Sequence, residues 1–118
     1  MSAVNLTVLL GECSGPPEIR TLSSGSTVAS LGVRAPTGDG STTSVPVTVW
    51  EPAGWIEDLD AGEVVLVVGR VRRRFFRTTT GATAARVDVE AEALTRARDR
   101  RRVGALLRRV ESALEPLG

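Results

Sequence analysis

The sequence predicts a mainly β fold of five strands that ends in one amphipathic α-helix. Short runs of alternating apolar and polar residues, separated by turns rich in Gly, Pro and Ser, fill the first 94 residues. From Thr95 onward the apolar residues recur at helical spacing instead. The 118 residues suit one modest core. We therefore divide the chain into a β domain over residues 1–94 and a basic amphipathic helix over residues 95–118.

The first half of the chain predicts three strands. The first covers residues 4–11, and the Pro16-Pro17 pair then begins a turn-rich connection. The second strand covers residues 28–34 and turns its odd-numbered apolar residues toward the core. After the loop PTGDGS, the third strand alternates up to Trp50, which lies on the face away from the core.

The second half predicts a short helix, two more strands and the terminal helix. Residues 52–62 hold the short helix, in which Trp55 is expected to fill the core. The fourth strand covers residues 64–77 and the fifth covers residues 84–93. This order of elements predicts an OB-fold, a partly open five-stranded barrel whose outer face binds oligonucleotides. The terminal helix has an apolar stripe that must cover the barrel or a neighbouring subunit. Its opposite, arginine-rich face is expected to be solvated. The apolar stripe consists of Val103, Leu106, Leu107, Val110, Leu114 and Leu117.

The fourth strand, VVLVVGRVRRRFFR, predicts a binding face. Because side chains alternate along a strand, Val65 and its odd-numbered neighbours face the core, and Arg70, Arg72, Arg74 and Phe76 face outward. Arginines neutralise phosphates and aromatic rings stack on bases, as in sequence-tolerant binders of single strands. The alternative is a solvated basic edge strand that prevents aggregation.

Charge is unevenly distributed along the chain. Residues 1–69 contain two arginines and eight acids, whereas residues 70–118 contain thirteen arginines and six acids. This asymmetry indicates a basic region that faces an anionic partner.

The composition argues against an enzyme and against a metal site. The chain has no histidine and no tyrosine, and its single Cys13 has no evident partner for catalysis or metal binding. Asp88, Glu90 and Glu92 alternate on one strand and can hold a cation, but we expect them to pair with nearby arginines. We expect no cofactor. Without an apolar run of about 18 residues or a signal peptide, the chain is expected to be a cytoplasmic protein that does not enter a membrane.

Two segments together resemble the bacterial single-stranded DNA-binding protein (SSB) family over residues 4–93. The first contains Asn5 and Leu9-Leu10-Gly11 and continues with Pro17-Glu18-Ile19-Arg20, Leu22, Ser24-Gly25 and Val28-Ala29. The second contains Ala61-Gly62, Val65, Val67, Gly69, Val71, Arg72 and Arg74. The resemblance implies an OB-fold that forms a homo-oligomer, a tetramer or dimer, and binds single-stranded DNA in replication, recombination or repair.

The resemblance also implies roles for particular residues. Phe76 and Trp50 match positions where the family has stacking aromatic residues. Arg72 and Arg74 match its basic positions, and Arg34 lies on the same outward face. With Arg70 from the strand pattern, these six residues form the predicted DNA-binding site.

The sequence departs from the family at several positions. Ser44 stands where the family usually has a tryptophan, and Pro46 stands where a polar or basic side chain is common. The basic helix replaces the family's glycine-rich tail with its acidic tip, which recruits protein partners, so the sequence predicts no particular protein partner. These departures favour an alternative function, an OB-fold protein-interaction or assembly subunit that has lost DNA binding.

Overall fold

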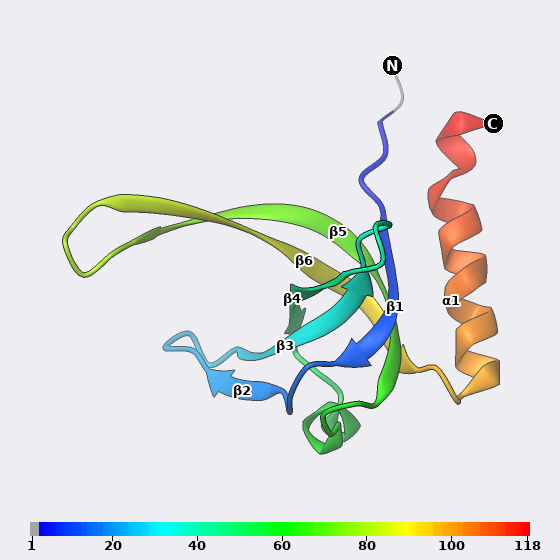
Figure 1. Ribbon diagram of the computed structural model, residues 1–118, viewed down its shortest axis with the longest axis horizontal. Helices are drawn as coiled ribbons and strands as arrows, with labels where there is room; N and C mark the ends of the chain where they lie inside the picture. Colours follow the sequence, from blue (N-terminus) through cyan, green and yellow to red (C-terminus); the bar gives the residue numbers. More distant parts are fainter. Residues whose placement is uncertain (1–2) are drawn as a thin grey trace.

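The computed structural model describes residues 3–118 and is mainly β (Figure 1). Six strands, two short 3₁₀-helices and one α-helix follow one another in the order β1 (Thr7–Cys13), β2 (Glu18–Thr21), β3 (Thr27–Pro36), β4 (Thr42–Trp50), η1 (Gly54–Asp58), β5 (Val64–Arg77), β6 (Thr83–Arg96), α1 (Arg100–Ala113) and η2 (Glu115–Leu117).

Five of the strands form a ring in the order β1-β5-β6-β4-β3, and β3 pairs again with β1. All neighbours in the ring are antiparallel except β4 and β6, which are parallel and pair Val47 with Val89 and Thr48 with Glu90. This is the strand order of an OB-fold with a short helix before the fourth ring strand. The predicted fold class is confirmed.

β2 is a strand that the sequence pattern did not predict. It pairs only with β3, outside the ring, and all four of its residues are exposed. Pro16, Pro17 and the Ser-Gly turn that follows indicated a connection without regular structure. The ladder with β3 nevertheless supplies this short strand with backbone hydrogen bonds along one edge.

The core lies inside the ring and uses the alternating apolar residues of the strands. It contains Cys13, Ala29, Leu31, Val33, Val47, Ile56, Leu59, Val65, Val67 and Val89. Trp55 packs against this cluster, as expected from its place in the short helix. Val71 was expected to face the core, but it is 47% exposed because the β1–β5 pairing ends at Gly69 and β5 continues beyond it.

β5 and β6 continue beyond the ring as a long hairpin arm (Figure 1). The two strands stay paired from Val65–Arg96 to Arg77–Thr83, with an irregular register between Val68 and Gly69. A Cβ atom on Gly69 would lie 2.1 Å from the Glu90 carbonyl oxygen, so only glycine allows the strands to approach this closely here. The arm therefore leaves the ring just beyond this glycine.

The helix α1 begins at Arg100, five residues later than the sequence pattern suggested, because β6 continues to Arg96. The Asp99 side chain caps it by accepting a hydrogen bond from the Arg102 backbone N–H. α1 lies against β5 and β6, but none of its residues is buried and Leu107 is exposed. The two predicted roles of its apolar stripe, covering the ring or a neighbouring subunit, stay predictions. Within residues 3–118, no helix is long and apolar enough to span a membrane.

Candidate nucleic-acid interface

The arm and the end of β4 together form a groove on the outer surface. The groove has a volume of about 450 Å³ and is lined by Trp50, Arg72, Arg73, Arg74, Phe75, Phe76 and Arg86. Trp50 is the last residue of β4, and the other six residues belong to the arm. Of the six residues predicted for the site, the groove brings together Trp50, Arg72, Arg74 and Phe76.

Three aromatic side chains of the groove are exposed. Trp50, Phe76 and Phe75 are 39%, 49% and 67% exposed, respectively. Phe75 was expected to turn away because side chains alternate along the strand, yet it lines the same groove. The guanidinium of Arg73 lies 5.4 Å from the centre of its ring. An exposed aromatic ring beside arginines is a surface on which a flat, electron-rich base can stack.

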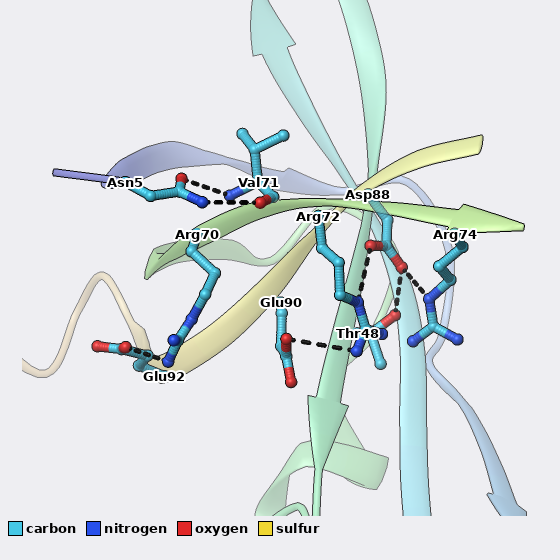
Figure 2. Close-up of polar contacts among 9 residues, drawn as sticks. All are labelled: Asn5, Thr48, Arg70, Val71, Arg72, Arg74, Asp88, Glu90 and Glu92. Carbon is cyan, nitrogen blue, oxygen red and sulfur yellow. Dashed lines mark hydrogen bonds and ion pairs between the residues drawn. The ribbon is translucent and has the colours of Figure 1, made fainter. Parts of the chain in front are cut away.

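The arginines of β5 pair with the alternating acids of β6 (Figure 2). Arg70 pairs with Glu92, and Arg72 pairs with Glu90 at 3.4 Å. Arg74 Nε lies 2.8 Å from Asp88 Oδ2. The expectation that these acids form ion pairs with nearby arginines is therefore confirmed. Because each of these three arginines already has a carboxylate partner, its charge is partly neutralised before any anion binds.

Asp88 organises the centre of this network (Figure 2). Its side chain has no exposed surface, and Oδ2 accepts hydrogen bonds from Arg74 Nε at 2.8 Å and from Thr48 Oγ1 at 2.9 Å. Arg72 Nε lies 3.9 Å from Oδ1. Arg72 Nε and Asp88 Oδ1 are buried without a hydrogen-bond partner, so Asp88 is hydrogen-bonded to Arg74 and pairs with Arg72 through charge alone.

Arg86 is a groove residue that the sequence analysis missed. It lies directly across the hairpin from Arg74, and no acid forms an ion pair with it among residues 3–118. Like charges at opposite positions of a strand pair destabilise a sheet, so this arrangement favours a bound anion. Alternation along one strand could not find it, because the turn at residues 78–82 sets the register that places residue 86 opposite residue 74.

Arg20 reaches the same region from β2. A pocket of about 50 Å³ has Arg20, Trp50, Arg74 and Arg86 among its lining residues. The sequence analysis could not place Arg20 because it did not predict β2 as a strand. Among residues 3–118, no aspartate or glutamate forms an ion pair with Arg20 either. Three arginines from three strands therefore surround Trp50.

Two predicted residues lie outside the groove. Arg34 is near the far end of β3 and lies 3.7 Å from Glu12. Arg70 lies where the arm leaves the ring and pairs with Glu92. Neither residue lines the groove.

A second groove continues from Arg86 over β3 and β4. It has a volume of about 480 Å³ and is lined mostly by small and hydroxyl-bearing residues, among them Ser30, Gly32 and Ser44. Ser44 donates a hydrogen bond to Ser14 at 3.1 Å. This part of the outer face has no aromatic side chain in its lining, in keeping with the missing tryptophan at position 44.

Potential metal ligands do not cluster among the residues that the structure describes. Between residues 3 and 118, no three His, Cys, Asp or Glu side chains gather in a way that could hold a metal ion. The free Cys13 is buried in the core, and burial in apolar surroundings raises the pKa of its thiol. The grooves offer stacking surfaces and positive charge, which suit binding of a flexible polyanion.

No family model and no curated protein matches the chain. Among solved structures, it is similar to the wild-type single-stranded DNA binding protein from Thermus aquaticus and to a deletion mutant of that protein, at 26% identity to each. The TM-scores are 0.64 and 0.65. Each match covers 79% of this chain and 40% of the other protein, so the chain spans less than half the length of those proteins.

Both similar structures are described as binding proteins, which agrees with the expectation that the chain is not an enzyme. The ring order, the position of the short helix and the likeness to these structures agree with the resemblance seen in the sequence. The chain therefore has an OB-fold and is SSB-like, that is, similar to bacterial single-stranded DNA-binding proteins.

Proposed function

We propose that the chain binds single-stranded DNA without strong sequence preference. The observation that carries this proposal is the groove in which Trp50, Phe75 and Phe76 are exposed among four arginines. Bases of any sequence stack on aromatic rings, and arginines bind the phosphates between them. The similar proteins from Thermus aquaticus, described as single-stranded DNA binding proteins, support the same function.

We expect the arginines to contribute unequally to phosphate binding. Arg72 and Arg74 are held by Asp88 at the groove, and Arg86 and Arg20 meet phosphates without competing carboxylates. Arg70 and Arg34 lie beyond the groove, where a longer strand reaches them. We therefore expect Arg86, rather than any of the four predicted arginines, to contribute most to phosphate binding.

The cellular setting follows from the family resemblance. We propose that residues 1–94 form the DNA-binding domain of a cytoplasmic homo-oligomer, a dimer or tetramer, that acts in DNA replication, recombination or repair. The basic helix over residues 95–118 is an addition to that domain. No cofactor takes part in this function.

The alternative is an OB-fold subunit that binds proteins instead of DNA. The exposed apolar residues Leu107 and Leu114 of the terminal helix favour it, together with the second groove, whose lining has no aromatic residue. Such a subunit would use the apolar stripe of α1 to bind its partner.

The first test is a titration with labelled oligo-dT of about 35 nucleotides, which exceeds the roughly 4–16 nucleotides that one OB-fold covers. A duplex of equal length serves as the comparison, and anisotropy and tryptophan fluorescence are followed at low and moderate salt. Tight, salt-sensitive binding of the single strand with fluorescence quenching supports the proposal. Absence of binding at low salt, or equally weak binding of both DNAs, supports the protein-binding alternative.

Two variants test the groove itself. Phe76→Ala removes one stacking surface and should weaken binding of all sequences by roughly 5- to 150-fold, which corresponds to 1–3 kcal/mol. Arg72→Ala should reduce the dependence of binding on salt. Val87→Ala is the matched control because Val87 is an exposed apolar residue of the same arm outside the groove lining. Unchanged DNA affinity in both groove variants would show that the groove does not take part in DNA binding.

A further inference from the structure

A second basic cavity lies on the side of the ring where β6 passes into α1. It has a volume of about 300 Å³ and is lined by Trp55, Thr95, Arg96, Arg98, Asp99 and Arg102. The guanidinium carbons of Arg96 and Arg102 lie 5.0 Å and 5.9 Å from the centre of the Trp55 ring. Trp55 thus orients two guanidiniums at this cavity, since an indole ring attracts a cation to its face.

Positive charge exceeds negative charge around this cavity. Arg96 is paired with Glu63 at 3.2 Å, and Arg102 is paired with Asp99 at 3.7 Å. Arg98 forms no ion pair with any described residue, and the neighbouring Arg100 and Arg101 form none either. Three arginines of the cavity, Arg96, Arg98 and Arg102, therefore have two carboxylate partners, Glu63 and Asp99, between them. A bound anion would relieve the repulsion that this excess creates.

A third cavity, the connecting cavity, shares lining residues with the basic cavity and with the groove around Trp50, Phe75 and Phe76, here called the aromatic groove. It has a volume of about 280 Å³, and its lining includes Trp50, which also lines the groove, and Trp55 and Arg102, which also line the basic cavity. Glu51 and Glu92 lie along this connection. Glu51 accepts a hydrogen bond from the Thr27 backbone N–H at 3.1 Å, and Glu92 pairs with Arg70. The two carboxylates are thus engaged by the protein itself.

We propose that the basic cavity is a second phosphate-binding site for the same DNA strand, reached from Trp50 through the connecting cavity. This inference rests on the proposed function. Arginines already lie against the Trp55 ring, so the cavity binds the sugar-phosphate backbone, whereas the aromatic groove binds bases. The start of the terminal helix is then part of the DNA-binding surface, and its arginines are not merely solvated.

The test compares two oligo-dT lengths with the full-length protein. One has about 8 nucleotides, enough for the aromatic groove, and the other has about 35 nucleotides, enough to continue to the second site. The variant is Arg98→Ala combined with Arg102→Ala. The control is Arg101→Ala combined with Arg108→Ala, which removes the same number of charges from exposed positions of α1 that do not line the cavity.

The Arg98→Ala/Arg102→Ala variant should bind the long oligonucleotide at least tenfold more weakly and leave binding of the short one within twofold. The slope of log affinity against log salt for the long oligonucleotide should fall by about 1.4, because each contact with a single-strand phosphate contributes roughly 0.7. The control pair should change neither quantity by as much. Thermal unfolding of both variants checks that the fold is kept.

Other results would overturn the inference. Equal weakening for both oligonucleotides, or equal weakening in the control pair, would mean that these arginines act only through general charge or through the fold. An unchanged affinity for the long oligonucleotide would show that the strand does not reach the cavity. Failure of the unaltered protein to bind even the short oligonucleotide would refute the proposed function itself, which is a distinct result.

Discussion

Replacement of Asp88 by asparagine removes a fully buried negative charge from beneath two arginines. Asp88 Oδ2 accepts hydrogen bonds from Arg74 at 2.8 Å and from Thr48 at 2.9 Å. Asparagine keeps an acceptor for one of these groups but loses the charge that holds the guanidiniums of Arg72 and Arg74. The replacement should therefore lower the free energy of unfolding.

The size of this loss in stability depends on how deeply Asp88 and its arginine partners are buried. Loss of one partner from a fully buried ion pair costs roughly 3–5 kcal/mol. The arginine side chains are 32% exposed, so water partly replaces the lost carboxylate. A hydrogen bond to a charged group contributes roughly 1.5–3 kcal/mol, and we expect Asp88→Asn to cost about 2–3 kcal/mol.

Urea unfolding measures this loss. With an m-value of roughly 1–3 kcal/mol/M, the midpoint should fall by about 0.7–3 M. Glu92→Gln is the control because both Glu92 and Arg70 are substantially exposed, and such surface pairs contribute roughly 0–1 kcal/mol. The reasoning is refuted if Asp88→Asn costs no more than Glu92→Gln.

Three further predictions concern the ring. Gly69→Ala should weaken the β5–β6 ladder, because its Cβ would lie 2.1 Å from the Glu90 carbonyl oxygen, and a lower melting temperature would show it. Cys13 should resist a thiol reagent at neutral pH until urea unfolds the protein, since burial raises its pKa and blocks access; fast labelling of the native protein contradicts this. The Glu63 carboxylate has its pKa held below the ordinary 4.5, chiefly by a hydrogen bond from the Asp60 N–H. Its stabilisation is present above that value and lost as pH falls through the lowered pKa, so Glu63→Gln should destabilise at pH 7 and less in acid.

Alternation of apolar residues was sufficient to predict the ring. Ala29, Leu31 and Val33 are buried as their spacing indicated, and the strands follow in the predicted order. The pattern failed where burial no longer depends on alternation. Val71 lies on the core-facing side of β5 but beyond the ring, and no local pattern shows where a hairpin leaves its barrel.

The candidate site was only partly predictable for a related reason. Residue type and alternation identified Arg72, Arg74 and Phe76, because these three residues lie on the same face of a single strand and no information about its neighbours is needed. Arg86 and Asp88 depend on the register between two strands, which the turn at residues 78–82 determines. Arg20 depends on β2, a strand too short and too exposed to leave a periodic pattern.

The β4–β6 junction is one of two short junctions that close the ring, the other being β1–β3, which also pairs at two positions. Among the described residues, β4 and β6 pair at two positions, and the Thr48–Asp88 hydrogen bond beside them joins residues 40 apart in the sequence. Contacts between distant residues form late in folding because the loop between them must first lose its conformational freedom. We therefore expect the β3–β4 and β5–β6 hairpins to form before the junction closes. In the native protein the β4–β6 junction should open before the hairpins do, so its amide hydrogens should exchange with solvent sooner than those of the β3–β4 and β5–β6 ladders.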